Sequence, residues 1–363
     1  MLKIHPSRLD IPTMTEEQWK DLLDARTEFI TEYRPGEPAP SHQEQRELLS
    51  QIPELRDEVA FWLLYDDDAH CVGYCTIAHP KPENPDYAAN KERVYVEPVV
   101  LARYRRQGVG TQLLPLIVKY ARKVGAIWIQ GDTKFESGFR FSEKIGATEV
   151  GQQRTNRLTV DQLDWELMQR WVEEGRSRNS DVELVRFVNL PVPDMIDPIC
   201  DLITDINRNQ PKDDLEGMSY TLTSEEFIRE NKRLEERKIQ RVIICTREPD
   251  GTLSGMTDMF HSEDSPTHAN VSLTGVRREY QNRGLGKWLK AAMMLDLREH
   301  DPSVRFVDTN NFNNNRPMLS INDRMGFELF EQFVFYKISV DDLAAIVDNS
   351  SSSPNASAQA KTA

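Results

Sequence analysis

The stretch that decides the fold is Tyr104-Arg105-Arg106-Gln107-Gly108-Val109-Gly110-Thr111. A valine- and tyrosine-rich segment, Arg93 to Val100, precedes it and predicts a strand. Apolar residues at helical spacing follow it: Leu113, Leu114, Ile117, Val118 and Ala121. A helix N-terminus favours an anion, and two glycines two positions apart leave its backbone amides bare. The stretch therefore predicts a strand–loop–helix unit that can hold a diphosphate.

The same pattern recurs in the second half of the chain. Tyr280-Gln281-Asn282-Arg283-Gly284-Leu285-Gly286-Lys287 follows a strand-like segment, Val271 to Val276, and precedes a second helical pattern. Gly284 lies 176 residues after Gly108, Gly255 lies 182 after Gly73, and Gly326 lies 180 after Gly146. Two copies at nearly constant spacing predict a duplicated domain.

The flanking segments predict the same order of elements in both halves. In the first half we expect a helix around Trp19 to Ile30 with a capping box at Thr15 and Gln18. The other predicted elements are strands at Ala60 to Tyr65, Val72 to Ala78 and Ala126 to Gln130, and a helix at Gly138 to Ile145. In the second half they are strands at Arg241 to Cys245, Gly255 to Phe260 and Val304 to Asp308, and a helix at Met318 to Arg324.

These patterns predict two domains and a tail. The first domain spans 1–176 and the second 177–345, with the boundary in the polar run Glu173 to Asp181. Residues 346–363 are predicted to be a disordered tail, because Asn349 to Ala363 is rich in serine, alanine and asparagine.

Composition narrows the function classes. The 363 residues carry a formal charge of −14, which makes nucleic acid a poor partner. No apolar run reaches the roughly 18 residues of a membrane span, and the N-terminus has no apolar signal core. The four cysteines are too scattered for a disulfide framework or a metal site. We expect a cytoplasmic protein, a monomer or homodimer, without a metal.

The two glycine loops fit the signature Q/R-x-x-G-x-G/A, as R-R-Q-G-V-G (Arg105 to Gly110) and Q-N-R-G-L-G (Gln281 to Gly286). The chain thereby resembles the GNAT superfamily of acyl-CoA N-acyltransferases. Ile145-Gly146-Ala147 and Met325-Gly326-Phe327 are similar to the family's late glycine landmark. The run with Asn311, Asn315, Pro317 and Met318 resembles bacterial tandem GNAT proteins such as mycothiol synthase.

The resemblance implies an α/β (α+β) fold of two GNAT-type domains. Each has a mixed, mostly antiparallel sheet flanked by helices, with a splayed central strand pair. It also implies that the loops bind coenzyme A, supplied as acetyl-CoA. The implied cofactor-binding residues are Val100, Arg105, Arg106, Gln107, Gly108, Val109, Gly110, Thr111, Val276, Gln281, Asn282, Arg283, Gly284, Leu285, Gly286, Lys287, Asn311 and Asn315.

The sequence does not assign the general acid or the general base. Many family members place a tyrosine four residues before the late glycine as an acid for the leaving thiolate, but here those positions hold Ser142 and Asn322. Candidate bases are Glu97, Asp258 and His261. The helix predicted after the first glycine loop contains Pro115, which lacks an amide and is expected to disturb a turn. We therefore favour the second half as the catalytic one.

The leading hypothesis is an N-acetyltransferase in which a small-molecule amine attacks the thioester directly. Two alternatives remain: a non-catalytic acyl-CoA-binding or regulatory tandem protein, and an enzyme that acetylates protein amines.

Overall fold

The computed structural model describes residues 2–52, 56–211 and 220–351. The chain divides into two compact units, and the first combines two separate stretches of sequence. Unit 1 comprises Met1–Val150 and Val334–Ala363, and unit 2 comprises Gly151–Phe333.

Unit 1 is built around a sheet in the order β1-β2-β3-β4-β5-β12. Every neighbouring pair is antiparallel except β4 and β5, which are parallel. Its strands are β1 His5–Leu9, β2 Asp57–Tyr65, β3 Cys71–Pro80, β4 Arg93–Val100, β5 Trp128–Thr133 and the later part of β12 Glu328–Ser339. Its helices are η1 Ile11–Thr13, α1 Glu16–Tyr33, α2 His42–Ser50, α3 Tyr87–Asn90, η3 Ala102–Tyr104, α4 Val109–Lys123, α5 Glu136–Lys144 and α11 Val340–Ser351.

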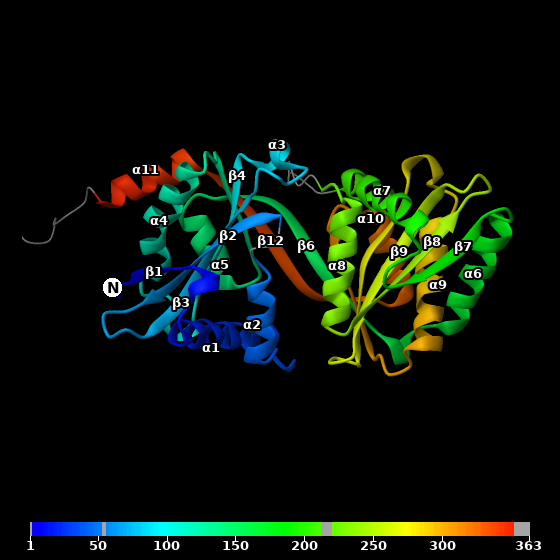
Figure 1. Cartoon of the computed structure of the whole chain (residues 1–363), viewed down its shortest axis with the longest axis horizontal. Coiled ribbons are helices and arrows are strands. Elements are labelled where there is room, and N and C mark those ends of the chain that lie inside the picture. Colours follow the sequence, from blue (N-terminus) through cyan, green and yellow to red (C-terminus); the bar gives the residue numbers. More distant parts are fainter. Residues whose placement is uncertain (1, 53–55, 212–219, 352–363) are drawn as a thin grey trace, which may run out of the picture. The chain divides into compact units, whose positions relative to one another are not determined.

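Helices cover both faces of this sheet (Figure 1), and each face has its own hydrophobic core. On one face α1 and α2 pack over side chains such as Leu63 and Val99. On the other, α4 and α11 pack over Val96 and Ile129. The predicted capping box begins α1: Thr15 Oγ1 accepts from the Gln18 amide at 3.2 Å, and Gln18 Oε1 accepts from the Thr15 amide at 3.0 Å.

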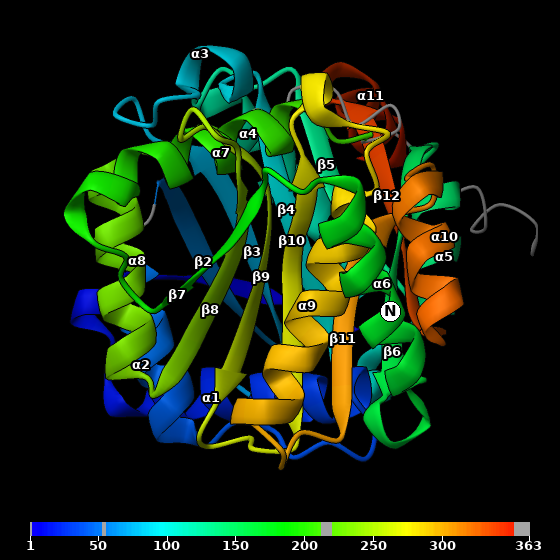
Figure 2. The same ribbon diagram turned by 90° about the vertical axis from the view of Figure 1, so that its right-hand side faces the viewer.

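Unit 2 repeats this plan in the order β6-β11-β10-β9-β8-β7, again with one parallel pair, β10 and β11. Figure 2 shows α6 and α9 side by side over one face of this sheet. Helices α7 and α8 pack on the other face. The elements are β6 Thr148–Thr159, η4 Val160–Gln162, α6 Trp165–Arg178, β7 Glu183–Val188, α7 Pro193–Asn209, α8 Ser224–Glu236, β8 Ile239–Arg247, β9 Leu253–Ser262, β10 His268–Val276, η5 Arg278–Tyr280, α9 Leu285–His300, β11 Phe306–Phe312 and α10 Arg316–Met325.

Two strands pass from one unit into the other. Strand β6 begins in unit 1, and its residues Gln153–Thr159 pair with β11 of unit 2. Strand β12 begins in unit 2, and its residues Val334–Ser339 pair with β5 of unit 1. Each unit thus receives a strand from the other half of the sequence, which a division at residue 176 does not anticipate.

The predicted elements are present, and the predicted fold class is confirmed, including the mixed sheets flanked by helices. Three local expectations need correction. Pro115 lies inside an unbroken α4, because its missing amide removes only one bond of the helix ladder. The run Glu173 to Asp181 is largely the end of α6, which packs on α9. Residues 346–351 of the predicted tail are helical in α11, and residues 352–363 lie outside the described part of the chain.

No helix among the described residues is long and apolar enough to cross a membrane.

Ile338 tests the exchanged strand, because this residue near the end of the chain packs in the core of unit 1 and is 6% exposed. Ile338→Ala should lower the free energy of unfolding by about 2–5 kcal/mol and speed hydrogen exchange at the amides of β5. Glu328→Ala, an exposed change on the same strand, is the matched control. Unchanged exchange in β5 would show that β12 does not support unit 1.

Candidate active site

The site in unit 1 begins where β4 and β5 part. The two strands pair only over Arg93–Tyr95 and Trp128–Gln130, although β4 continues to Val100 and β5 to Thr133. At the start of this divergence the two backbones are still close together. A Cβ added at Gly131 would lie 2.6 Å from the Val96 carbonyl oxygen. The predicted splayed strand pair is therefore present.

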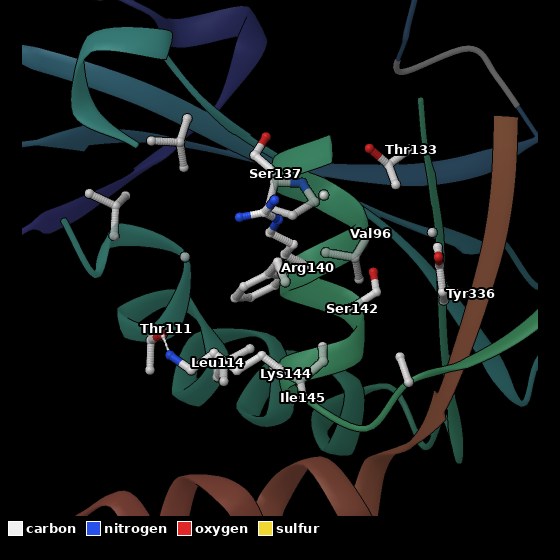
Figure 3. A pocket seen from close by; sticks show the side chains of 18 of the residues that line it. Val96, Thr111, Leu114, Thr133, Ser137, Arg140, Ser142, Lys144, Ile145 and Tyr336 are labelled. Carbon is white, nitrogen blue, oxygen red and sulfur yellow. Dashed lines mark hydrogen bonds between the residues drawn. The ribbon is translucent and has the colours of Figure 1, made fainter. Parts of the chain in front are cut away.

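A cavity of about 850 Å³ opens at this splay. Its walls come from the end of β4, the loop Arg105 to Thr111, helix α4, strand β5 and helix α5. Figure 3 shows Ser137, Arg140, Ser142 and Lys144 on α5, with Thr133 and Tyr336 at another side. A cavity of this volume lies within the range of ligand sites, roughly 300–1,000 Å³.

The loop has the geometry of an anion site. Gly108 caps α4 in the left-handed conformation with φ of 88°, and Arg106 also has a positive φ, 62°. This turn presents the first amides of a 15-residue helix at the cavity wall, where the helix dipole favours negative charge. Lys144 adds a cation from α5, and its Nζ donates to Thr111 Oγ1 at 3.2 Å.

Arg105 was predicted to bind the cofactor, but its side chain is engaged by other residues of the protein. Its Nη1 and Nη2 donate to the two carboxylate oxygens of Glu32 at 2.5 and 2.6 Å, and its Nε donates to the Val100 carbonyl at 2.9 Å. Arg105 therefore braces the loop against α1 and β4. The exposed Arg106 and Lys144 are better placed to meet an anion.

Two carboxylates follow the last paired residues of the splayed strands. Tyr95 and Gln130 are register partners, and Glu97 and Asp132 each lie two positions further on. Because Val96 and Ile129 face α4, strand alternation puts Glu97 and Asp132 on the α1 face. Sequence reasoning found Glu97 but missed Asp132, whose position depends on the register of the parallel pair.

Both carboxyls have raised pKa values. Desolvation raises the pKa of Asp132 to about 6. Desolvation also raises the pKa of Glu97, against the opposing influence of Arg26 and a hydrogen bond from Thr76 at 3.4 Å. Both side chains still reach water, as proton exchange requires. A carboxylate with a pKa near neutrality is a better proton acceptor than an ordinary one.

A phenol lies on the opposite face. Tyr336 pairs with Gly131, so its side chain shares the α4 and α5 face and lines the cavity with Ser142 (Figure 3). Desolvation, then the charges of Glu149 and Glu143, raise its pKa, which keeps the hydroxyl protonated. Sequence analysis did not single out Tyr336, because β12 lies about 200 residues after β5 in the sequence and the pairing of the two strands is not visible there.

The second glycine loop has a similar backbone and different surroundings. Gly284 and Asn282 have φ of 80° and 65°. Arg283 donates to Asn179 Oδ1 at 3.1 Å and to Glu248 Oε1 at 3.0 Å, and Lys287 donates to Glu174 at 2.5 Å. The cations of this loop are thus neutralised by neighbouring carboxylates. Gln281 donates to the carbonyl of Val276, and Leu285 is buried beneath the loop.

Asn311 and Asn315 line a different cavity, of about 350 Å³, whose walls include none of the residues 281–287. Asp258 is buried in an ion pair with Arg241 at 2.8 Å and accepts the Leu273 amide at 2.7 Å. His261 lies between Asp301 and the Pro266 carbonyl, at 3.2 Å from each. These contacts give Asp258 and His261 structural roles, so neither is favoured as a base.

Comparison with known proteins agrees with this geometry. Residues 19–146 match the sequence profile of the acetyltransferase (GNAT) family. These residues form an acetyltransferase (GNAT) domain. The matched segment includes the first glycine loop and ends at Gly146. Comparison with curated protein sequences found no matching relative.

Two solved structures are similar to this chain over nearly its whole length. A tandem GNAT protein from the clavulanic acid biosynthesis pathway, solved without acetyl-CoA, has 19% identity and a TM-score of 0.70, over 93% of this chain and 99% of that one. A GCN5-related N-acetyltransferase from Sphaerobacter thermophilus has 15% identity and a TM-score of 0.62, over 93% and 96%. These likenesses show the fold. The profile match of residues 19–146 confirms the predicted acetyltransferase class.

Gly110 tests the first loop. A Cβ at Gly110 would lie 3.0 Å from the Phe141 ring, so Gly110→Val should close the passage between α4 and α5. We expect calorimetric binding of coenzyme A to fall at least tenfold while the protein stays folded.

The equivalent glycine of the second loop, Gly286, supplies the control. At Gly286 a Cβ would have its nearest neighbours at 3.8 and 3.9 Å, so Gly286→Val should be tolerated and leave that binding unchanged. Loss of binding only in the Gly286 variant would move the site to unit 2.

Proposed function

We propose that unit 1 transfers an acetyl group from acetyl-CoA to a primary amine of a small molecule. The observation that carries this proposal is one continuous cavity joining the glycine loop to Asp132 and Tyr336. The proposal departs from the sequence-based preference for the second half, where the loop cations are paired and the nearby cavity omits the loop.

Binding would use the loop and the splay together. The pyrophosphate would accept from the amides at the start of α4, assisted by Arg106 and Lys144. Beyond Tyr95, no β5 residue in the described part of the chain pairs with β4. An amide of β4 near Val100 can then donate to the thioester oxygen and stabilise the oxyanion that forms during attack.

Proton transfer would use the two faces of the sheet. A carboxylate on the α1 face, Asp132 or Glu97, removes a proton from the ammonium or from the attacking amine. The nitrogen forms the amide bond, the carbon–sulfur bond breaks, and Tyr336 protonates the departing thiolate from the α5 face. Ser142 remains near as a hydrogen-bonding group.

The acidic α1 face also suits the acceptor. Glu97 and Asp132 place negative charge where the amine would arrive, which attracts its cationic form. Only the neutral amine attacks, so a carboxylate of raised pKa serves both attraction and deprotonation.

Turnover is the first test. The protein is expected to release free thiol from acetyl-CoA with at least one member of a panel of small primary amines. Binding of acetyl-CoA without amine-dependent thiol release would support the non-catalytic alternative. Release only with peptide amines would support protein acetylation.

Asp132→Asn tests the base. With the native protein kcat/KM should rise between pH 5 and 7, because the carboxyl must lose its proton at a pKa of about 6. The variant should lose about a hundredfold in kcat and lose this pH limb. Glu97→Gln is the matched comparison: a larger loss there would assign the base to Glu97.

Folding of the Asp132 variant is checked by its melting temperature. A folded-state pKa above the unfolded value means that ionisation weakens the fold as pH rises through about 6. The neutral asparagine should therefore melt at an equal or higher temperature at pH 8, separating a lost base from a lost fold.

A further inference from the structure

The second cavity, in unit 2, carries chemistry that the proposed reaction does not use. It occupies about 350 Å³ between β9, β10 and β11 on one side and α7 on another. The charged side chains that line it are Glu230, Arg241, Asp258 and Lys290. Amides and hydroxyls make up most of the remaining polar lining.

Lys290 is the feature that separates this cavity from its counterpart. It lies 176 residues after Leu114, the same spacing as between the two glycine loops, and Leu114 lines the cavity of unit 1 (Figure 3). Lys290 is only 2% exposed, yet it reaches the cavity wall. The duplicated position has changed from an apolar group to a buried amine.

A chain of hydrogen bonds extends from this amine. Lys290 Nζ donates to Asn322 Oδ1 at 2.6 Å, and Asn322 Nδ2 donates to Asn311 Oδ1 at 2.7 Å. With its oxygen occupied, Asn311 offers its Nδ2 donor to the cavity. Lys290 itself keeps two further N–H donors when protonated.

Arg241 adds a second buried cation. It is 4% exposed, and its guanidinium carbon lies 4.8 Å from the Phe227 ring centre and 5.1 Å from that of Phe260. Its Nη2 is paired with Asp258, but Nε and Nη1 have no acceptor among the described residues. Asp258 is already engaged by Arg241 and by the Leu273 amide. These two donors are unsatisfied, and the carboxylate of the lining outside the Arg241–Asp258 pair is Glu230 of α8.

We propose that the cavity of unit 2 binds a small carboxylate of about amino-acid size, held by Lys290 and Asn311 and attracted by Arg241. Buried donors without acceptors cost free energy, and an anionic oxygen satisfies them. The volume lies at the lower end of ligand sites, roughly 300–1,000 Å³, which excludes a whole coenzyme A. This assignment is independent of acyl transfer in unit 1 and is tested by binding alone.

The experiment is calorimetric titration of the full chain with succinate, L-malate and L-glutamate in turn, at pH 6.5. We expect one site per chain for at least one of these carboxylates. Lys290→Met should weaken carboxylate binding at least tenfold. This is the effect expected when a hydrogen bond to a charged group, worth about 1.5–3 kcal/mol, is lost. Asn311→Asp keeps the oxygen that accepts from Asn322 and replaces the free donor by a carboxylate, so it should abolish binding.

Two controls separate this cavity from the loops. Lys287→Met, on the same helix but paired with Glu174, should leave carboxylate binding unchanged. Saturating coenzyme A should not displace the carboxylate. Displacement by coenzyme A, or loss of binding in the Lys287 variant, would place the anion at a glycine loop and overturn the proposal.

The pH dependence gives a second readout. Burial lowers the pKa of Lys290 to about 7, so its charge is present below that pH and lost above it. Carboxylate affinity should therefore fall from pH 6.5 to pH 8 in the native protein, and Lys290→Met should remove this dependence. Binding of inorganic phosphate but of none of the carboxylates, or no binding at all, would also overturn the proposal.

Discussion

The pairing of β12 with β5 is the constraint on which unit 1 depends. Strand β5 shares only three register pairs with β4 but six with β12, so β12 holds β5 in the sheet. With β5 secured from that side, β4 is free to diverge after Tyr95 and leave the gap at which the cavity opens. The same strand brings Tyr336 to the cavity. One exchanged strand thus supports the core, permits the splay and supplies the phenol.

Duplication has kept the backbone and changed the chemistry around it. Both loops cap their helix with a glycine in the left-handed conformation, preceded by a non-glycine residue of positive φ at Arg106 or Asn282. In both, the carbonyl two residues before the helix is held by a donor: Leu2 N on Gln107, and Asn179 Nδ2 on Arg283. The difference lies in the side chains beyond the loop. Leu114 leaves an apolar wall, whereas Lys290 starts a buried polar network.

The proposed chemistry of unit 1 depends on the two faces of one sheet. Alternation along β4 and β5 puts carboxylates on the α1 face and the packed thioester path on the α4 face. Desolvation then raises the pKa of Asp132, although the residue is exposed at the surface. A surface carboxylate in an acidic chain becomes a suitable base through its position at the strand divergence.

The sequence by itself determined the local structure and the resemblance to GNAT acetyltransferases. Each strand–loop–helix unit, the capping box at Thr15 and the two glycine turns follow from contacts between near neighbours. The spacing of the glycines in the sequence indicates the two turns directly. The sequence could not determine which strand completes which sheet, because the two halves are similar enough for either pairing to satisfy a local pattern. Only the tertiary structure decided that β12 joins β5, that Asp132 lies level with Glu97, and that Arg105 is engaged by Glu32. Those relations join residues far apart in the chain, where register and burial, not local propensity, set the contacts.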